Sequence, residues 1–409
     1  MIRRLAAKQF KSIRDTGMTM GRCTLLIGPN AGGKSNILDA VRFLQGVGNG
    51  FTVREILDGT PPGAAYRSWA GLRGGAAEAL WRGDEPADTG PDSWLHDLPR
   101  QSFAIYAALA EAEQDGYIIA VHPEHALIVH ETLQWQGKGF VTLAEPDPQD
   151  VILARLWRGK KGQPPQWPFP TATPLLTRIP AVPPAKSSPA ELSAACRAVA
   201  AQFANIQFLD LDPKCLRAYA QRDHPAMGDH GENFAAVALH LAEEGVLQPW
   251  LSQLLPDGVR AIRPFRTEFG EVMFGVEDTT SAHISARSLS DGTLRFVALT
   301  TALLAPTRPD LLLIEEIENG LHPARLGLIV EMLLAAAEER GQIIATTHSP
   351  AVLAHWPEDR HEDILVVTRA DDGRGTEIVS LPDMPGYEEA LAHQRLDELH
   401  IEGWTAAPV

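Results

Sequence analysis

The sequence predicts a mixed α/β protein whose core is assembled from two distant segments of the chain. Strand-like stretches alternate with stretches of helical spacing near both ends, in residues 2–50 and 258–380. A glycine-rich loop at residues 28–35 joins an apolar strand to a helix. Between the two ends lies a stretch of different composition, with many prolines from residue 145 to 189. These observations favour a sheet flanked by helices, interrupted by a helical and irregular insertion.

Composition excludes some functions. The chain has 409 residues, a formal net charge of −16 and 44% hydrophobic residues, which is ordinary for a globular protein. The negative charge excludes a uniformly basic protein that coats nucleic acid or anionic lipid. Cys23, Cys196 and Cys215 lack metal-ligand spacing and indicate free thiols in a reducing compartment. With no signal peptide and no apolar run of about 18 residues, we expect a cytoplasmic protein without a membrane partner.

The first third of the chain contains strands and one clear helix. The helix starts at Ser35 and extends to about Leu44, because apolar residues recur at helical spacing, and we expect the glycines at 46–50 to end it. The expected strands cover residues 2–8, 23–27, 103–110, 117–121 and 126–132. This order predicts that the glycine-rich loop lies at the end of a strand.

The middle of the chain has a different sequence pattern. Residues 145–189 are predicted to form an irregular connection, because their prolines break a helix. Helices are expected at 190–203 and 233–243, the second with a capping box formed by Asp229 and Glu232. In the last third, strands are expected at 258–267, 271–276, 311–314, 343–346, 364–368 and 377–380, and helices at 291–304, at 323–339 and from about 350.

The glycine-rich loop carries the strongest chemical signal. It matches the pattern G-x-x-x-x-G-K-[ST] directly after a strand and before a helix, which is the context that a phosphate-binding loop needs. Its backbone N–H groups and the helix N-terminus would cradle phosphates, Lys34 would reach the β- and γ-phosphates, and the Ser35 hydroxyl would bind Mg²⁺. The predicted ATP-binding residues are Gly28, Pro29, Asn30, Ala31, Gly32, Gly33, Lys34, Ser35 and Asn36.

A second signal is an apolar strand, 311–314, that ends in two carboxylates. Buried parallel strands deliver their carboxyl ends to the ligand crevice of an open α/β sheet. Glu315 is then expected beside Mg²⁺ or its waters, and Glu316 as the general base that polarises the attacking water. A solvated pair at the end of a strand is the alternative interpretation, and the phosphate loop makes it the weaker one.

Two further segments have plausible roles in the same site. Ser288-Leu289-Ser290-Asp291-Gly292 precedes an apolar helix, with Ser290 as its N-cap and Gly292 allowing a ligand to approach the backbone. His348 follows the strand 343–346 and could contact the γ-phosphate. Taken alone, the first segment fits an ordinary capped helix and the second a structural histidine.

These four segments, in this order, resemble the ABC-type ATPases of the SMC and RecF class. Residues 10–14, Phe-Lys-Ser-Ile-Arg, are also similar to the N-terminal segment of that class. The resemblance implies an ABC ATPase head with ATP and Mg²⁺, in which Lys34, Glu316 and His348 are catalytic and Asn319 belongs to the D-loop. It further implies a homodimer or higher oligomer formed with ATP, in which a signature motif of Ser288, Ser290, Asp291 and Gly292 contacts the γ-phosphate held by the other subunit.

The sequence departs from this class in places. The acidic strand ends Glu-Glu rather than Asp-Glu, and Asp291 and Thr293 are variant positions of the signature. No heptads for long arms follow the phosphate loop, and the 61 residues after His348 are too few for the nuclease domain of OLD-family enzymes. The predicted division is therefore an N-terminal half-head at 1–135, an insertion lobe at 136–257 and a C-terminal half-head at 258–409.

The sequence allows several hypotheses about the biological role of the protein. The best match within the class, a short group related to OLD-family nucleases, implies a regulatory ATPase that controls a separately encoded effector in antiphage defence. The alternatives are a DNA-binding repair or chromosome-maintenance ATPase and a nucleotide-gated scaffold with little turnover. Candidate nucleic-acid contacts are Arg73 in a glycine-rich turn, a patch at Arg155, Trp157, Arg158, Lys160 and Lys161, and Arg260, Arg263 and Arg266. For each of them, solvated side chains are the preferred interpretation.

One further cluster allows two interpretations. Asp223, His224, Asp229, His230 and Glu232 carry side chains that bind metals. The preferred interpretation is a solvated loop at a capped helix entrance.

Overall fold

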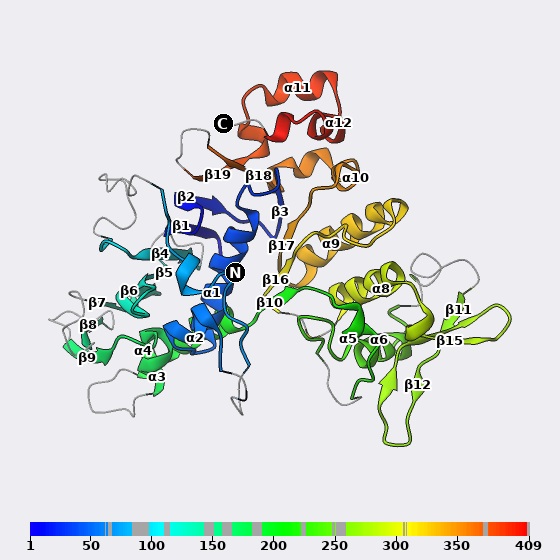
Figure 1. Ribbon diagram of the computed structural model, residues 1–409, viewed down its shortest axis with the longest axis horizontal. Helices are drawn as coiled ribbons and strands as arrows, with labels where there is room; N and C mark the ends of the chain where they lie inside the picture. Colours follow the sequence, from blue (N-terminus) through cyan, green and yellow to red (C-terminus); the bar gives the residue numbers. More distant parts are fainter. Residues whose placement is uncertain are drawn as a thin grey trace.

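The computed structural model describes residues 1–61, 63, 68–83, 98–109, 115–142, 151–157, 166–181, 190–221, 226–247, 250, 259–305, 307, 309–370 and 375–406. Within these ranges an eight-stranded and a six-stranded β-sheet form most of the core, with helices between and outside them (Figure 1). No helix in these ranges is both long and apolar enough to cross a membrane.

The six-stranded sheet has the order β10-β16-β17-β3-β18-β19, in which the first five strands are parallel and β19 is antiparallel. The strands are β10 (Ile206–Leu209), β16 (Leu311–Ile314), β17 (Gln342–Thr346), β3 (Cys23–Ile27), β18 (Ile364–Arg369) and β19 (Thr376–Ser380). Because β3 lies between two strands from the other end of the chain, both ends build this sheet, as the sequence predicts.

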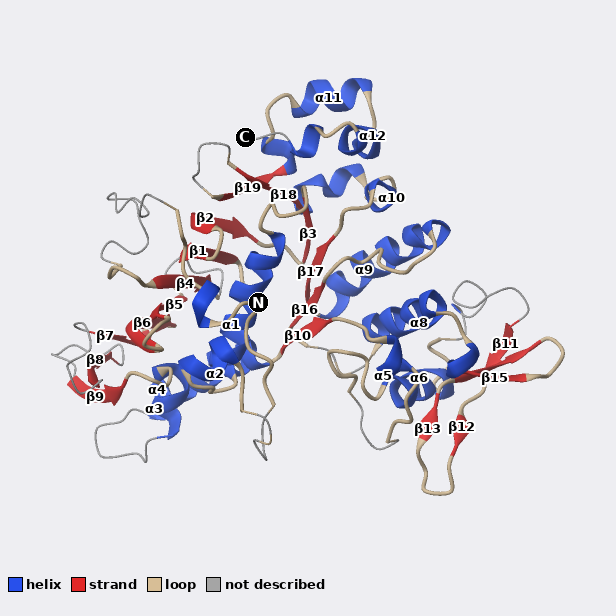
Figure 2. Ribbon diagram, viewed as in Figure 1, coloured by secondary structure: helices blue, strands red, loops and turns tan. Residues whose placement is uncertain are grey.

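Both faces of this sheet are buried, because successive side chains of a strand point to opposite faces. Leu26 and Leu313 face a core shared with α1 (Lys34–Gly48) and α4 (Ala190–Ala204), whereas Leu25 and Leu312 face a core shared with other helices. The helices of the second core are α6 (Phe234–Glu243), α8 (Asp291–Leu304), α9 (Leu326–Arg340) and α10 (Pro350–Leu353) (Figure 2). The parallel strands are therefore mostly apolar, with polar residues such as Thr24 and Gln342 buried among the apolar ones.

The eight-stranded sheet is antiparallel and packs against α1 and α4 from the other side. Its order is β2-β1-β4-β5-β6-β7-β8-β9, formed by β1 (Arg4–Phe10), β2 (Ile13–Thr19), β4 (Phe103–Ala108), β5 (Gly116–His122), β6 (Leu127–Trp135), β7 (Lys138–Thr142), β8 (Val151–Trp157) and β9 (Gln166–Pro170). The expected boundary between residues 135 and 136 lies in the turn between β6 and β7, and strand pairing continues across it.

Several expectations from the sequence are wrong in detail. Residues 145–189 include β8, β9 and α3 (Leu175–Ala181) rather than only irregular connections; Pro168 and Pro170 are accommodated because β9 is the edge strand. The glycines at 46–50 do not end α1 at once, since Val47 is still buried in the core. Asp229 and Glu232 do not form a capping box: α6 begins after Asn233, and Glu232 accepts from the backbone N–H of His230.

The remaining elements form two peripheral groups. A lobe beside α8 contains α5 (Pro213–Leu216) and the short strands β11 (Val259–Ile262), β12 (Phe265–Arg266), β13 (Val272–Met273), β14 (Gly275–Asp278) and β15 (His283–Ser285) (Figure 1). The C-terminal residues form α11 (Tyr387–His393) and α12 (Leu396–Ile401), and α2 (Val53–Asp58) follows α1. Beyond β8, β9 and α3, the elements that the sequence did not predict include β2, β7, β10, β15, α2, α5, α11 and α12.

Candidate nucleotide-binding site

The glycine-rich loop lies between the end of β3 and the start of α1. Its first residue, Gly28, has φ 133°, and a Cβ at this position would lie 2.1 Å from the carbonyl oxygen of Val367 in β18. Only glycine fits this approach, because the loop is pressed against the neighbouring strand. Asn36 in the first turn of α1 donates to the hydroxyl of Ser12 at 2.6 Å, which also contacts the hydroxyl of Thr376 at 2.7 Å. The segment 10–14 therefore supports the loop.

Lys34 is folded into the loop. Its side chain is buried, and its Nζ donates to the carbonyl oxygens of Gly28 at 2.7 Å and Pro29 at 3.0 Å. Burial lowers the pKa of Lys34 to about 8, while the carboxylates of Glu316, Glu318 and Glu315 act in the opposite direction. The ammonium group is thus held where a phosphate chain in the loop would meet it.

Ser35 and Glu315 bring two oxygen ligands together. The Ser35 hydroxyl donates to Glu315 Oε1 at 2.8 Å, although the residues are 280 positions apart. Mg²⁺ prefers hard oxygen ligands and commonly takes only one or two from the protein. This pair of groups therefore fits the Mg²⁺ site that the sequence predicts, and the extra methylene of Glu315 does not keep the carboxylate from reaching Ser35.

Arg73 is a site residue whose contacts the sequence did not reveal. Its half-exposed guanidinium contacts Glu315 Oε1 at 3.0 Å, Asp39 Oδ1 at 3.1 Å and the carbonyl oxygen of Ser35 at 2.8 Å. Asp39, buried on α1, also accepts from Lys11, whose Nζ donates to the carbonyl oxygen of Arg73 at 2.6 Å. The one available signal was Asp39, an acidic residue that lies between apolar positions of α1, four positions after Ser35.

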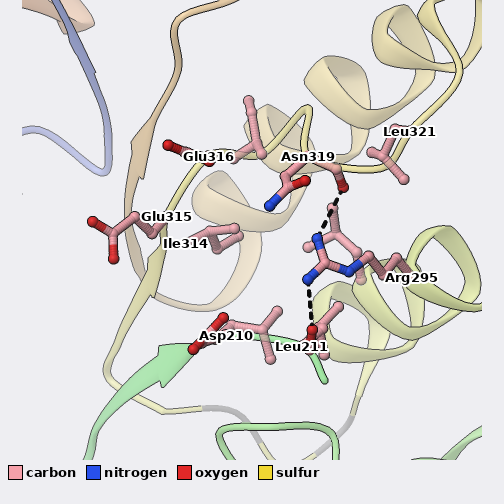
Figure 3. A pocket seen from close by; sticks show the side chains of 11 residues that line it. Asp210, Leu211, Arg295, Ile314, Glu315, Glu316, Asn319 and Leu321 are labelled. Carbon is pink, nitrogen blue, oxygen red and sulfur yellow. Dashed lines mark hydrogen bonds between the residues drawn. The ribbon is translucent and has the colours of Figure 1, made fainter. Parts of the chain in front are cut away.

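Glu316 follows Glu315 but leaves the strand conformation. Its φ is 51°, in the left-handed region, and its backbone N–H donates to the Thr346 hydroxyl of β17 at 2.9 Å. Figure 3 shows that both carboxylates, of Glu315 and Glu316, point away from the guanidinium of Arg295 in α8. The acidic pair is therefore fixed between the ends of β16 and β17.

His348 is positioned by a carboxylate from the segment after β16. Its backbone N–H donates to Glu318 Oε1 at 2.7 Å, and the Thr347 hydroxyl donates to Glu318 Oε2 at 2.8 Å. Its imidazole hydrogen-bonds the backbone of Gly28, and burial followed by the charge of Lys34 lowers the pKa of His348. The histidine thus lies against the glycine-rich loop, where burial and the charge of Lys34 both disfavour its charged form.

The structure brings Lys34, Ser35, Glu315, Glu316 and His348 together at the carboxyl ends of three neighbouring strands. The predicted signature residues lie elsewhere, at the start of α8: Ser288, Ser290 and Asp291 are exposed and Gly292 is half-buried. Ser290 caps α8 as expected, since its Oγ accepts from the N–H of Thr293 at 3.2 Å.

The signature segment is tied to the predicted D-loop of the same chain. Arg295 donates to the carbonyl oxygens of Asn319 at 3.3 Å and Leu211 at 2.8 Å, as Figure 3 shows. A Cβ on Gly292 would lie 2.3 Å from the carbonyl oxygen of Gly320, so the two backbones touch. The two segments therefore pack directly against each other.

The candidate metal-binding cluster and the candidate DNA-binding patches lie only partly within the described residues. The described residues contain no cluster of three or more His, Cys, Asp or Glu side chains placed to hold a metal, and Asp223 and His224 lie outside those residues. Arg263 pairs with Glu277 at 2.7 Å and Arg266 pairs with Glu243 at 3.2 Å. The other candidate patch is only partly described, since residues 158–165 lie outside the described ranges.

The parallel sheet, the loop between β3 and α1, and the acidic end of β16 define the fold of a P-loop ATPase head of the ABC type. A protein-family model described as "AAA domain, putative AbiEii toxin, Type IV TA system" matches residues 23–76 and 204–354, just over half of the chain. The chain belongs to this family. No curated protein matches the sequence significantly.

One of the solved structures similar to this chain indicates its fold. An SMC head bound to the C-winged-helix domain of ScpA aligns at 15% identity with a TM-score of 0.52, covering 96% of this chain and 99% of that chain. The SMC head from Thermotoga maritima aligns at 14% identity with a TM-score of 0.44, covering 93% of this chain and 98% of that chain. An SMC head from Pyrococcus furiosus aligns at 14% identity with a TM-score of 0.46, covering 96% of this chain and 99% of that chain. The first alignment assigns the ABC-type head fold, and the OLD-family relationship stays a prediction.

Proposed function

We propose that the chain binds ATP with Mg²⁺, hydrolyses it as an ATP-dependent homodimer, and regulates a separate effector protein. The observation that carries this proposal is the meeting of Lys34, Ser35, Glu315, Glu316 and His348 around the loop between β3 and α1. An ammonium, a hydroxyl, two carboxylates and an imidazole at one sheet edge are the groups that phosphoryl transfer to water requires.

Each group has one role in the proposed reaction. The backbone N–H groups of the loop and the ammonium of Lys34 bind the β- and γ-phosphates. Ser35 and Glu315 would hold Mg²⁺, which neutralises phosphate charge when bound. Glu316 accepts a proton from the water that attacks the γ-phosphorus in line with the bond to the β-phosphate, and that bond breaks to release ADP and phosphate. His348 contacts the γ-phosphate from the side of β17.

The homodimer completes each site in trans. The signature residues Ser288, Ser290, Asp291 and Gly292 lie at the N-terminus of α8, which carries partial positive charge. In the proposed arrangement this N-terminus faces the γ-phosphate bound by the other subunit, with Asn319 at the interface. Because the signature and the D-loop touch within one chain, engagement of one ATP is transmitted to the other site.

The proposed effector role is supported by the family and by a neighbour. The family description names a putative toxin of a type IV toxin–antitoxin system, and we propose antiphage defence as the setting of the effector role. The structural neighbour is an SMC head in complex with a domain of a different protein. Direct DNA binding is the alternative, and it is disfavoured because Arg263 and Arg266 are paired with carboxylates. A nucleotide-gated scaffold is the second alternative.

Two variants test the ATPase proposal. Lys34→Ala should lose ATP binding, whereas Glu316→Gln should bind ATP, form a stable dimer and lose about 10²–10⁴-fold in turnover, the contribution of a general base. Binding is measured with a fluorescent ATP analogue, turnover by phosphate release and dimerisation by sedimentation. Glu331→Gln on the exposed side of α9 is the matched control. Wild-type turnover in Glu316→Gln would refute the assignment of the base.

The same assays separate the biological alternatives. Co-expression with the product of the neighbouring reading frame, purified with and without ATP, tests for an effector complex. Stimulation of turnover by DNA, weakening as salt rises, would favour the DNA-binding ATPase. ATP-dependent dimerisation of the wild type with negligible turnover would favour the scaffold.

A further inference from the structure

The signature segment carries a negative charge where a phosphate is expected to bind. Asp291 is the first residue of α8, and its side chain is 63% exposed. A helix N-terminus favours an anion, and here the carboxylate of the chain itself occupies that position. A triphosphate approaching Ser290 and Gly292 from another subunit would therefore meet a like charge unless a cation compensates for it.

A single arginine supplies that cation. Arg217, at the C-terminal end of α5, donates from Nη2 to Asp291 Oδ1 at 2.5 Å and to the carbonyl oxygen of Leu289 at 2.9 Å. Its Nη1 donates to the carbonyl oxygen of Pro213 at 3.3 Å, which fixes the guanidinium on α5. The same group thus neutralises Asp291 and holds the backbone on the other side of Ser290.

We propose that Arg217 is a positioning residue for the ATP site in trans: it neutralises Asp291 and holds residues 289–291 so that the signature accepts the γ-phosphate bound by a second copy of this chain. This role rests on the proposed homodimer. The opposite side of the signature is fixed by Arg295 and the contact between Gly292 and Gly320, so Arg217 is the contact that controls its charge.

The proposed role predicts that Arg217 affects assembly of the dimer but not ATP binding by the monomer, whereas a purely structural arginine would affect both. The phosphate loop of the same chain has its own cations, Lys34 and Arg73, so binding of ATP to a monomer does not involve Arg217. Assembly of the dimer does involve it, because only then do Asp291 and the γ-phosphate come together. Removing the charge of Asp291 should therefore make Arg217 dispensable for charge compensation.

The test uses the full chain with Glu316→Gln, which is expected to trap the ATP-bound dimer. Sedimentation at rising ATP concentration gives the midpoint of dimerisation, and a fluorescent ATP analogue gives the affinity of the monomer. Arg217→Ala should weaken dimerisation on the order of tenfold, the effect expected for an uncompensated like charge near phosphate, and leave the monomer affinity unchanged. Adding Asp291→Asn should restore dimerisation to within about twofold.

Controls keep the outcome specific. Arg263→Ala removes an arginine–glutamate pair from the same lobe, at 2.7 Å and away from the signature, and should leave dimerisation unchanged. Thermal unfolding of Arg217→Ala shows whether the lobe stays folded. Unchanged dimerisation in Arg217→Ala, or a loss that Asp291→Asn does not restore, overturns the proposed role. If Glu316→Gln binds ATP but stays monomeric, the homodimer itself is refuted, and this role of Arg217 with it.

Discussion

Glu318 is the carboxylate that holds the loop of His348 in place, and its removal tests whether that loop must be ordered for hydrolysis. It accepts two hydrogen bonds, from the His348 backbone N–H at 2.7 Å and from the Thr347 hydroxyl at 2.8 Å. Glu318→Ala removes both bonds. Glu318→Gln keeps one acceptor oxygen and removes the charge. Both changes leave the hydrogen bonds of the phosphate loop and of Glu316 in place. They also remove one of the carboxylates that raise the pKa of Lys34, so ATP binding is compared at pH 7 or below, where it should stay close to wild type.

The magnitude follows from the two bonds. A hydrogen bond to a charged group contributes about 1.5–3 kcal/mol, so losing both bonds removes about 3–6 kcal/mol of stabilisation from the loop. Because His348 is only half-buried, we expect the lower end of this range in Glu318→Ala. That corresponds to a loss in kcat of about 100-fold, at 1.36 kcal/mol for each factor of ten, and we expect about tenfold for Glu318→Gln.

The assay is steady-state phosphate release at saturating ATP, with binding of a fluorescent ATP analogue measured in parallel. Thr347→Val removes one of the two bonds and should lie between wild type and Glu318→Ala. Glu331→Ala, an exposed carboxylate on α9, is the matched control. A kcat of Glu318→Ala within twofold of wild type would refute the reasoning. A large loss of ATP affinity would show instead that Glu318 supports the phosphate loop.

Two predictions concern pH. Because the pKa of Lys34 is lowered to about 8, its ammonium loses its proton as pH rises through this value. ATP affinity should therefore be about tenfold weaker at pH 9 than at pH 7. Titration with a fluorescent ATP analogue at both pH values measures the affinity, and an unchanged affinity would contradict the prediction. Glu131 lies fully buried in β6, and burial raises its pKa to about 7. The folded state therefore binds more protons than the unfolded state between pH 4.5 and 7. As pH rises across that window, the free energy of unfolding should fall by about 3 kcal/mol. Thermal unfolding at pH 5, 6 and 7 measures this fall, and Glu131→Gln should remove most of it.

The predictable part of the site is the part encoded by short segments. The loop at 28–35 is recognisable because a strand, a glycine pattern and a helix are contiguous, and the structure has β3 and α1 at those positions. Strand β16, helix α8 and the N-cap Ser290 also lie where the sequence predicts, because burial and capping act within a few residues. Each of these features depends on local backbone preferences.

Arg73 shows why the rest was not predictable. It lies in a turn with Gly71, Gly74 and Gly75, and locally this pattern is the same as that of a solvated turn. Its partners, Asp39 and Glu315, are 34 and 242 positions away, and only the assembled sheet brings them together. Strand β9 escaped prediction for a related reason: Pro168 and Pro170 are tolerated only because β9 lies at the edge of the sheet, and edge position is decided by the other strands.

The long-range contacts also explain how the departures from the class fit together. Glu315 replaces a shorter carboxylate, and Arg73 and Ser35 both bind its longer side chain. Asp291 replaces a neutral residue at the signature, and Arg217 pairs with it. In both cases an arginine from outside the recognised motif binds the variant carboxylate. The variant residues and their arginines therefore form two charge pairs that should be exchanged together, so that altering one member alone perturbs the proposed site more than altering both.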